Sequence, residues 1–260
     1  SSSFLGWTLI VLWLVNLRDE QMRDISIPSD NLHGNRIVAW GIHLFTASSV
    51  IWSLLAIIAI IGHQWQLAFA WMMLAACIDF LDGSLARYFR IGSILPEFDG
   101  ALLDNIVDYL SYVFVPALFL WGSDLLPSEW KLPSAIMISL ASAYQFCQSD
   151  AKTTDHSFKG FPSYWNFAIF YLFFLKWNPW INFAILFFLS LFVFVPIKYA
   201  YPSLMKRYKL PTVILTLTWF VILVAILIQY PNQQYWLILT SLLYVVYYVA
   251  ISLYLKPNRN

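Results

Sequence analysis

Long runs of apolar residues alternate with short polar breaks along most of the chain. From Ile37 onward, the apolar runs cover residues 37–62, 65–90, 99–122, 132–149, 162–176, 179–200, 210–230 and 235–255. A helix needs about 20 predominantly apolar residues to cross a bilayer, and turn-forming residues such as Gly62, Pro127 and Pro231 lie in the breaks. The pattern predicts an all-α, polytopic integral membrane protein with about eight transmembrane helices.

The N-terminal part of the chain departs from this pattern. Residues 4–17 are apolar, but the stretch is shorter than a comfortable span and is followed by Arg18, Asp19 and Glu20. We expect an interfacial amphipathic helix there, and a cleavable signal peptide is less favoured because no basic residue precedes the apolar stretch. We therefore divide the chain into an N-terminal extension (1–36), a transmembrane domain (37–255) and a cytoplasmic tail (256–260).

Composition agrees with a membrane protein and narrows the classes of partner. Hydrophobic residues make up 60% of the chain and charged residues only 11%, against roughly a quarter charged in soluble domains. The formal net charge of +1 leaves no basic surplus for a nucleic-acid partner. Cys77 and Cys147 lie in separate apolar runs, so we expect buried thiols and neither a disulfide framework nor a cysteine metal site.

The placement of lysine and arginine predicts an orientation. If eight spans begin at Ile37, only Lys131 and Lys176 fall on one side, against 13 basic residues on the other. Basic residues favour the cytoplasmic side of short loops, so the richer side is predicted to be cytoplasmic. Its members are Arg18, Arg23, Arg36, Arg87, Arg90, Lys152, Lys159, Lys198, Lys206, Arg207, Lys209, Lys256 and Arg259.

Four acidic residues lie within predicted spans, on the cytoplasmic side. Asp79 and Asp82 lie near the end of the second run, and Asp104 and Asp108 near the start of the third. Spacings of three and four residues place side chains on one face of a helix. Ionisable groups at membrane depth are costly, and clustered carboxylates attract hard divalent cations. The sequence therefore predicts a divalent metal site between two helices.

Small residues and an arginine accompany the carboxylates. Gly83, Ala86 and Gly100 leave the backbone open to close approach by a ligand or by a neighbouring helix. Arg87 lies one turn beyond Gly83, where its guanidinium could pair with phosphate or act as an anchor on the cytoplasmic side. A metal site beside an arginine and glycines suggests a pyrophosphate ligand.

These spaced residues resemble the signature of the CDP-alcohol phosphatidyltransferase family. The eight matching positions are Asp79, Asp82, Gly83, Ala86, Arg87, Gly100, Asp104 and Asp108. The gap between the arginine and the next glycine, Tyr88 to Asp99, is 12 residues here and shorter in most of the family. This gap resembles the bacterial phosphatidylcholine synthase branch, as do residues 160–166 and 194–198. The resemblance covers the chain from about Ile37 to Leu255.

The resemblance implies roles for the four carboxylates. In the family, the carboxylates that match Asp79, Asp82 and Asp104 hold a pair of divalent cations, Mn²⁺ or Mg²⁺. The carboxylate that matches Asp108 is the general base for the acceptor hydroxyl and shares in metal binding. A carboxylate that accepts the hydroxyl proton during attack lowers the barrier, and metals neutralise charge on the phosphates.

The resemblance also implies the substrates and their place. The expected reaction condenses CDP-diacylglycerol with choline to give phosphatidylcholine and CMP. It would take place in the bacterial inner membrane, among membrane lipid, at a site facing the cytoplasm, in a homodimer. The residues expected to bind the CDP moiety are Asp79, Gly83, Ala86, Arg87 and Gly100.

Recognition of choline points to aromatic residues, because a quaternary ammonium offers no hydrogen-bond donor and binds through cation–π contacts and nearby negative charge. We rank Trp165, Tyr144 and Asp150 highest, while His43 and Thr46 on the first helix could also reach the site. Membrane-interface belts explain most aromatic residues equally well. The other aromatic candidates are Tyr109, Tyr112, Phe146, Phe161 and Tyr164.

Two alternatives remain open at this point. The chemistry could be kept with another acceptor, such as serine, inositol or glycerol phosphate. A transporter or channel could instead use the carboxylates to pass ions, although transporters commonly place their site near the midplane, whereas these carboxylates lie toward one side.

Overall fold

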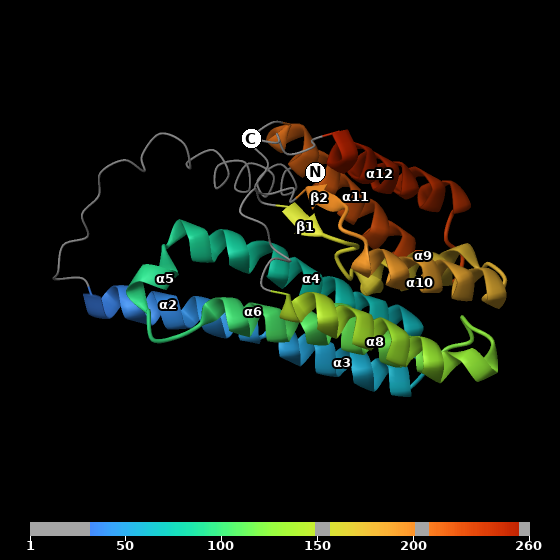
Figure 1. The fold of residues 1–260 in the computed structure, drawn as a ribbon, viewed down its shortest axis with the longest axis horizontal. Coiled ribbons are helices and arrows are strands. Elements are labelled where there is room, and N and C mark those ends of the chain that lie inside the picture. The colour runs from blue at the N-terminus through green and yellow to red at the C-terminus, as the bar shows by residue number, and fades with distance from the viewer. Residues whose placement is uncertain (1–31, 149–156, 201–207, 255–260) are drawn as a thin grey trace.

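The computed structural model describes residues 32–148, 157–200 and 208–254, which form a helical bundle with one small sheet (Figure 1). The predicted interfacial helix at 4–17, Asp150 and the tail 256–260 lie outside the described residues. The elements are α2 (Leu32–Ala47), α3 (Ser49–Ile61), α4 (Trp65–Tyr88), α5 (Ile91–Ile94), α6 (Gly100–Asp108), the π-helix η2 (Tyr109–Phe114), α7 (Val115–Gly122), the short 3₁₀-helix η3 (Ser128–Trp130), α8 (Lys131–Cys147), β1 (Ser157–Lys159), α9 (Trp165–Leu175), α10 (Pro179–Phe194), β2 (Lys198–Ala200), α11 (Lys209–Ile228) and α12 (Tyr235–Tyr254).

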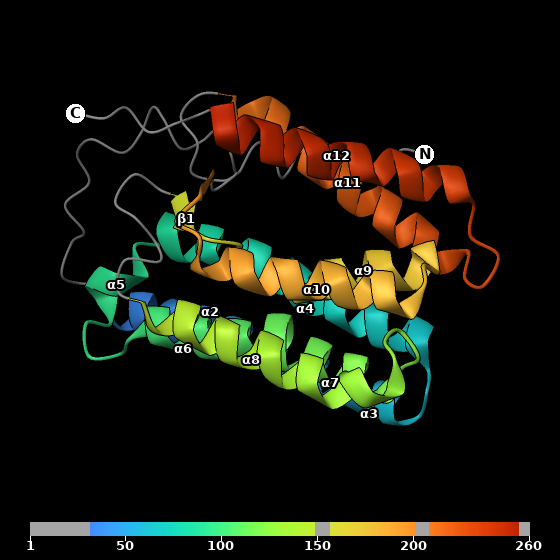
Figure 2. The same ribbon diagram turned by 45° about the vertical axis from the view of Figure 1, so that its right-hand side comes forward.

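The longer helices run roughly along a common axis, and α4 lies near the middle of the bundle (Figure 2). It packs against α2 and α3 on one side and against α11 on another, while α11 and α12 pair at the outer edge. The continuous series α6, η2 and α7 contacts α2, α3, α4 and α8. The helix α4 is therefore held between several neighbours, whereas α6 packs mainly against α2.

The all-α prediction is confirmed, and every predicted apolar run contains helix. Among the described residues, five helical segments are long and apolar enough to cross a membrane. The runs at 132–149, 162–176 and 179–200 form the shorter helices α8, α9 and α10. With a rise of about 1.5 Å per residue, the 11 residues of α9 extend only about 16 Å, roughly half of the hydrocarbon core. The count of eight spans stays a prediction.

The outer faces of the bundle carry large apolar side chains. Leu44, Ile58 and Val246 are each at least 65% exposed although they lie on long helices. Extended apolar surface of this kind is unfavourable in water and favourable against lipid tails. Together with the five candidate spans, it makes the chain a multi-pass membrane protein.

A two-stranded sheet interrupts the helical pattern. β1 pairs antiparallel with β2, with Ser157 opposite Ala200, and the apolar pattern predicts neither strand. The apolar run at 179–200 is helical only as far as Phe194, where α10 ends. Val195 precedes Pro196, a position that disfavours helical backbone, and Val195 has the extended angles φ −84° and ψ 122°.

The two cysteines are also less enclosed than expected. Cys77 is only partly buried, and Cys147 is exposed, so the prediction of two buried thiols is wrong for Cys147. Cys147 is the last residue of α8, where neighbouring helices no longer cover the side chain. Both thiols are free, as expected.

The 12-residue gap of the motif folds back onto α2. Within it, Ile91 of α5 and Leu95 just after α5 are 3% and 1% exposed and pack with Ala39 and Ile42 of α2. Phe98 then places its ring 4.5 Å from that of His43, measured between ring centroids. The long gap therefore forms a small apolar cluster that joins the start of α6 to α2.

An ion pair also connects the same segment to α2. Arg36 at the start of α2 donates to the Glu97 carboxylate. The Glu97 backbone N–H and the Arg36 guanidinium together hold the pKa of that carboxyl below its usual range. The pair is exposed, so we assign it a role in fixing the segment rather than a large share of stability.

Gly100 is the point of closest approach between α6 and α2. A Cβ at this position would lie 2.6 Å from Cε1 of His43, closer than such contacts allow. His43 cannot easily yield, because its ring packs against Phe98 and Trp40. The glycine therefore lets the helix that carries Asp104 and Asp108 start close to α2.

Adding one methyl group at this contact should loosen the start of α6. We expect Gly100→Ala to lower the free energy of unfolding by about 1–3 kcal/mol, the usual range for overpacking, measured as thermal unfolding of the purified protein in detergent. In a double-mutant cycle with His43→Ala, the two losses should not add, because the smaller side chain removes the clash. Strictly additive losses would show that Gly100 is constrained by something other than His43.

Candidate metal centre

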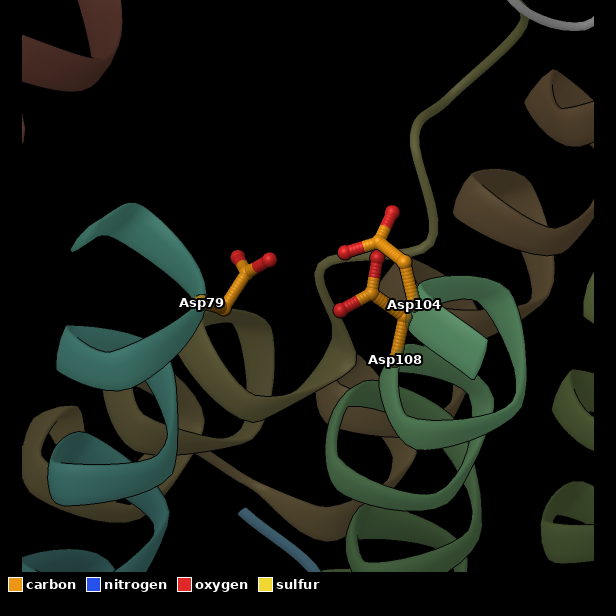
Figure 3. A group of neighbouring side chains, drawn as sticks. All are labelled: Asp79, Asp104 and Asp108. Atoms are coloured by element: carbon orange, nitrogen blue, oxygen red, sulfur yellow. The ribbon is translucent and has the colours of Figure 1, made fainter. Parts of the chain in front are cut away.

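Three carboxylates from two helices converge at one place in the bundle. Oxygen atoms of Asp79 on α4 and of Asp104 and Asp108 on α6 all lie within 4.8 Å of one another. Figure 3 shows the Asp79 side chain directed toward the pair on the neighbouring helix. All three are partly buried. The structure thus brings together three of the four carboxylates singled out in the sequence.

Local helix structure explains this arrangement. Asp99 begins α6 as its N-cap, and its side chain accepts a hydrogen bond of 2.9 Å from the backbone N–H of Leu102, a common way to start a helix. Asp104 and Asp108 are then one helical turn apart on the same face. Because α4 packs near this face, Asp79 meets them from the opposite side.

The geometry of the three carboxylates fits a hard divalent cation. Mg²⁺ binds oxygens at about 2.1 Å, so two ligand atoms on one ion lie at most about 4.2 Å apart. Separations up to 4.8 Å need only small side-chain rotations to meet that limit, and two ions about 3.5–4 Å apart would bridge a wider set. The donor chemistry, all carboxylate oxygen, also suits Mg²⁺ or Mn²⁺.

Asp82 lies outside the three-carboxylate group. Its side chain is 4% exposed and lies beside the Thr46 hydroxyl of α2. Among the described residues, its Oδ1 has no hydrogen-bond partner although it is buried. Such an orphaned carboxylate oxygen is costly, and a nearby cation would reduce that cost. The role of Asp82 as a ligand stays a prediction.

Tyr112 is a site residue that the sequence ranking missed. Its hydroxyl donates a hydrogen bond of 2.7 Å to Oδ2 of Asp79, and its side chain is only 6% exposed. It lies on η2, a helix that begins directly after Asp108. The spacing of four residues from Asp108 is the available signal, although the sequence alone indicates Tyr112 only as one of several aromatic candidates for choline.

Two more rings adjoin Tyr112. The Tyr164 ring centroid lies 5.7 Å from that of Tyr112, and the Phe167 ring lies 6.4 Å from Tyr112 and 6.3 Å from Tyr164. Both residues are partly buried and belong to the start of α9. An aromatic cluster therefore adjoins the carboxylates on the side of α9.

The remaining motif residues lie toward the C-terminal end of α4. The Arg87 guanidinium folds back over Gly83, where a Cβ would come within 3.2 Å of Nη1, and it donates to Ser84 Oγ at 3.3 Å. Ala86 packs against the cluster around Ile91 and Leu95. Gly83 thus gives room to the arginine, and Gly100 gives room to His43 rather than facing open space.

The three highest-ranked choline residues fare differently. Trp165 is fully buried, and its indole N–H donates to Ser142 Oγ at 2.7 Å, so no face is open to a ligand. Tyr144 is 51% exposed and packs its ring 5.0 Å from that of Phe194, with no contact to the carboxylates recorded among the described residues. Asp150 lies outside the described residues. We do not retain Trp165 as a choline ligand.

The chain is similar to known proteins over most of its length. The sequence pattern of the CDP-alcohol phosphatidyltransferase family matches residues 42–251. The chain is 39% identical to the phosphatidylcholine synthase of Legionella pneumophila over 83% of its own length and 88% of the relative. It is 43% identical to the phosphatidylcholine synthase of Legionella bozemanae, over 76% of this chain and 95% of the relative. It is 36% identical to the phosphatidylcholine synthase of Pseudomonas aeruginosa, over 76% of this chain and 83% of the relative. The chain therefore belongs to the CDP-alcohol phosphatidyltransferase family.

Proposed function

We propose that this protein is a phosphatidylcholine synthase, which transfers the phosphatidyl group of CDP-diacylglycerol to choline. The observation that carries the proposal is the meeting of Asp79, Asp104 and Asp108 within 4.8 Å across two membrane helices. The names of the relatives, all phosphatidylcholine synthases, support choline as the acceptor.

The reaction needs a base beside the acceptor hydroxyl. The choline oxygen attacks the phosphorus that carries diacylglycerol, and the bond from that phosphorus to the bridging pyrophosphate oxygen breaks. CMP leaves with that oxygen, and the hydroxyl proton passes to a carboxylate. We assign this base to Asp108, which lies on the same face of α6 as Asp104 and is only partly buried. A carboxylate that accepts the proton during attack makes a neutral alcohol an effective nucleophile.

Asp79, Asp104 and Asp108 would hold the divalent cation, with Asp82 as a fourth ligand after rotation toward the group. When bound, Mn²⁺ or Mg²⁺ neutralises charge on the phosphates under attack and on the leaving CMP. The three carboxylates already point toward one another (Figure 3), so binding needs little reorganisation of the backbone. Their mutual repulsion favours occupation by a cation.

The CDP moiety would lie along the end of α4, between Asp79 and Arg87. The Arg87 guanidinium would pair with a phosphate oxygen, for which its planar donors are well suited. Gly83 and Ala86 have small side chains, so they leave space for a ligand on this side of α4. Gly100 fixes the distance between α6 and α2. In this assignment Gly100 contributes through packing against His43.

For choline we propose Tyr164 in place of Trp165. Tyr164 is partly exposed, and its ring packs 5.7 Å from that of Tyr112, which is hydrogen-bonded to Asp79. A quaternary ammonium near Tyr164 would be attracted both by the ring face and by the carboxylates. Trp165 instead supports the position of its neighbour from within the core.

The charge distribution supports an orientation with the site toward the cytoplasm. Thirteen of the 15 basic residues fall on the side predicted to be cytoplasmic, and Arg87 and Arg90 lie at the end of α4 nearest the acidic group. We propose a bacterial inner-membrane location and retain the homodimer as an expectation from the family. The division into 1–36, 37–255 and 256–260 also stays a proposal.

Removal of divalent metal should abolish the reaction. We expect protein purified in detergent and treated with a chelator to release no CMP from CDP-diacylglycerol and choline, and Mn²⁺ or Mg²⁺ to restore release. Metal binding should also stabilise the folded protein, by about 2.7 kcal/mol at a metal concentration 100 times Kd. This stabilisation should appear as a higher midpoint of thermal unfolding. The double variant Asp79→Asn/Asp104→Asn should lose this stabilisation, and full activity without metal would contradict the assignment.

Loss of the base should slow the reaction while the protein stays folded. We expect Asp108→Asn to lower kcat for CMP release by at least about 10²-fold, the lower end of general-base effects. The matched control is Asp124→Asn, the same change at an exposed carboxylate whose partner is Lys131. Wild-type turnover in Asp108→Asn would refute the mechanism.

Acceptor choice should depend on Tyr164 and not on Trp165. Loss of a cation–π contact costs about 1–2 kcal/mol, so Tyr164→Leu should raise KM for choline by about 10-fold with little change for CDP-diacylglycerol. Trp165→Phe should instead lower stability, by about 1 kcal/mol or more for the lost buried hydrogen bond. An acceptor panel with serine belongs to the same assay, and turnover with serine but not choline would overturn the acceptor.

A further inference from the structure

We infer that Tyr112 is a positioning residue for the metal centre, and that its hydroxyl fixes the Asp79 carboxylate in the orientation that a cation needs. The inference deepens the proposed function and rests on it for the identity of the reaction. It concerns a residue outside the eight motif positions. The hydrogen bond, the helix that carries Tyr112 and the rings around it all support it.

The hydrogen bond ties the two metal-binding helices together. Tyr112 Oη donates to Asp79 Oδ2 at 2.7 Å, joining η2 to α4 across 33 positions of sequence. An ionised carboxylate only accepts hydrogen bonds, whereas the phenol supplies a donor. The bond therefore selects one rotation of the carboxylate and leaves lone pairs on both oxygens for a cation.

The π-helix places Tyr112 where it can make this bond. η2 spans Tyr109–Phe114 and begins directly after Asp108. A π turn contains about one residue more than an α turn, so it shifts every later side chain around the helix axis. Asp108 can thus face the acidic group while Tyr112, one turn on, reaches across to α4. Such π turns are often found at functional sites.

The aromatic neighbours prevent the phenol from swinging away. Tyr112 is 6% exposed, and the rings of Tyr164 and Phe167 pack against it with centroid distances of 5.7 and 6.4 Å. Buried aromatic pairs of this kind have well-defined geometry. The position of the phenol is consequently held by this packing as well as by the hydrogen bond to Asp79.

Partners of this type tune metal sites. Groups that hydrogen-bond to a ligating side chain orient it, and their removal typically weakens metal binding by about 10- to 100-fold. In this chain the neutral phenol also offsets part of the repulsion that Asp79 meets from Asp104 and Asp108. We therefore expect the hydroxyl to contribute to metal affinity rather than to contact either substrate.

The same π-helix supplies a matched control. Tyr109 also buries part of its ring and donates through its hydroxyl, at 3.0 Å, but to the backbone oxygen of Ser139 on α8. Tyr109→Phe and Tyr112→Phe both delete one phenol hydroxyl from η2 and keep the ring. Only the second deletion affects a carboxylate of the metal centre.

The test measures Mn²⁺ binding directly. Full-length protein in detergent is titrated with Mn²⁺ alone, and free Mn²⁺ is counted by electron paramagnetic resonance. We expect Tyr112→Phe to raise Kd for Mn²⁺ by about 10-fold and Tyr109→Phe to leave it unchanged. At saturating Mn²⁺, Tyr112→Phe should retain KM for choline within about twofold of wild type, because the effect acts through Asp79.

A double-mutant cycle distinguishes positioning from a general structural effect. In the Asp79→Asn background, Tyr112→Phe should produce no further loss of Mn²⁺ affinity. Equal Mn²⁺ affinity in Tyr112→Phe and wild type would overturn the inference, as would an equal loss in Tyr109→Phe. If Mn²⁺ binding depends on Tyr112 as described but no CMP is released with choline, the positioning role stands and the proposed function fails.

Discussion

The repulsion among carboxylates inside a membrane protein is the constraint on which this structure depends. At an effective dielectric constant of about 20, two unit charges 4–5 Å apart repel by roughly 3–4 kcal/mol, and the acidic group contains three such pairs. Proteins keep ionisable groups at membrane depth when partners or a function offset this cost. Here the offsetting elements are the phenol of Tyr112 and, when bound, a divalent cation.

The rest of the bundle keeps α4 and α6 at the distance that this arrangement requires. Gly100 lets α6 start against His43 of α2. The segment between α4 and α6 packs Ile91 and Leu95 against α2 as well. Across the bundle, Trp165 is held by Ser142, which fixes the start of α9 and thus Tyr164. These contacts are local and apolar or neutral, so they add no charge of their own beside the acidic group.

Helix periodicity was sufficient to predict apolar helices along the chain and the approach of Asp79 to Asp104 and Asp108. It could not separate Asp79 from Asp82, because a spacing of three residues turns a side chain by about 60° around the helix axis. Two residues separated by that angle count as lying on one helix face in a sequence pattern. In the structure the angle is large enough to direct Asp79 to α6 and Asp82 to α2. It also could not find Tyr112, whose direction depends on a π turn. The burial of Trp165 could not be predicted either, because 49 aromatic residues give no pattern that separates core from site.

The packing of α4 favours group transfer over ion passage. The acidic group lies in the half of α4 near Tyr88, about 14 Å from that end at 1.5 Å per residue. In the other half, Ala68, Phe69 and Met72 are at most 3% exposed, and the Phe69 ring packs 4.7 Å from that of Phe119. An ion path needs polar groups or water along its length, and this packed apolar layer interrupts one. A site that lies nearer one end of α4, with packed apolar residues toward the other end, suits a reaction between a lipid-held donor and a soluble alcohol.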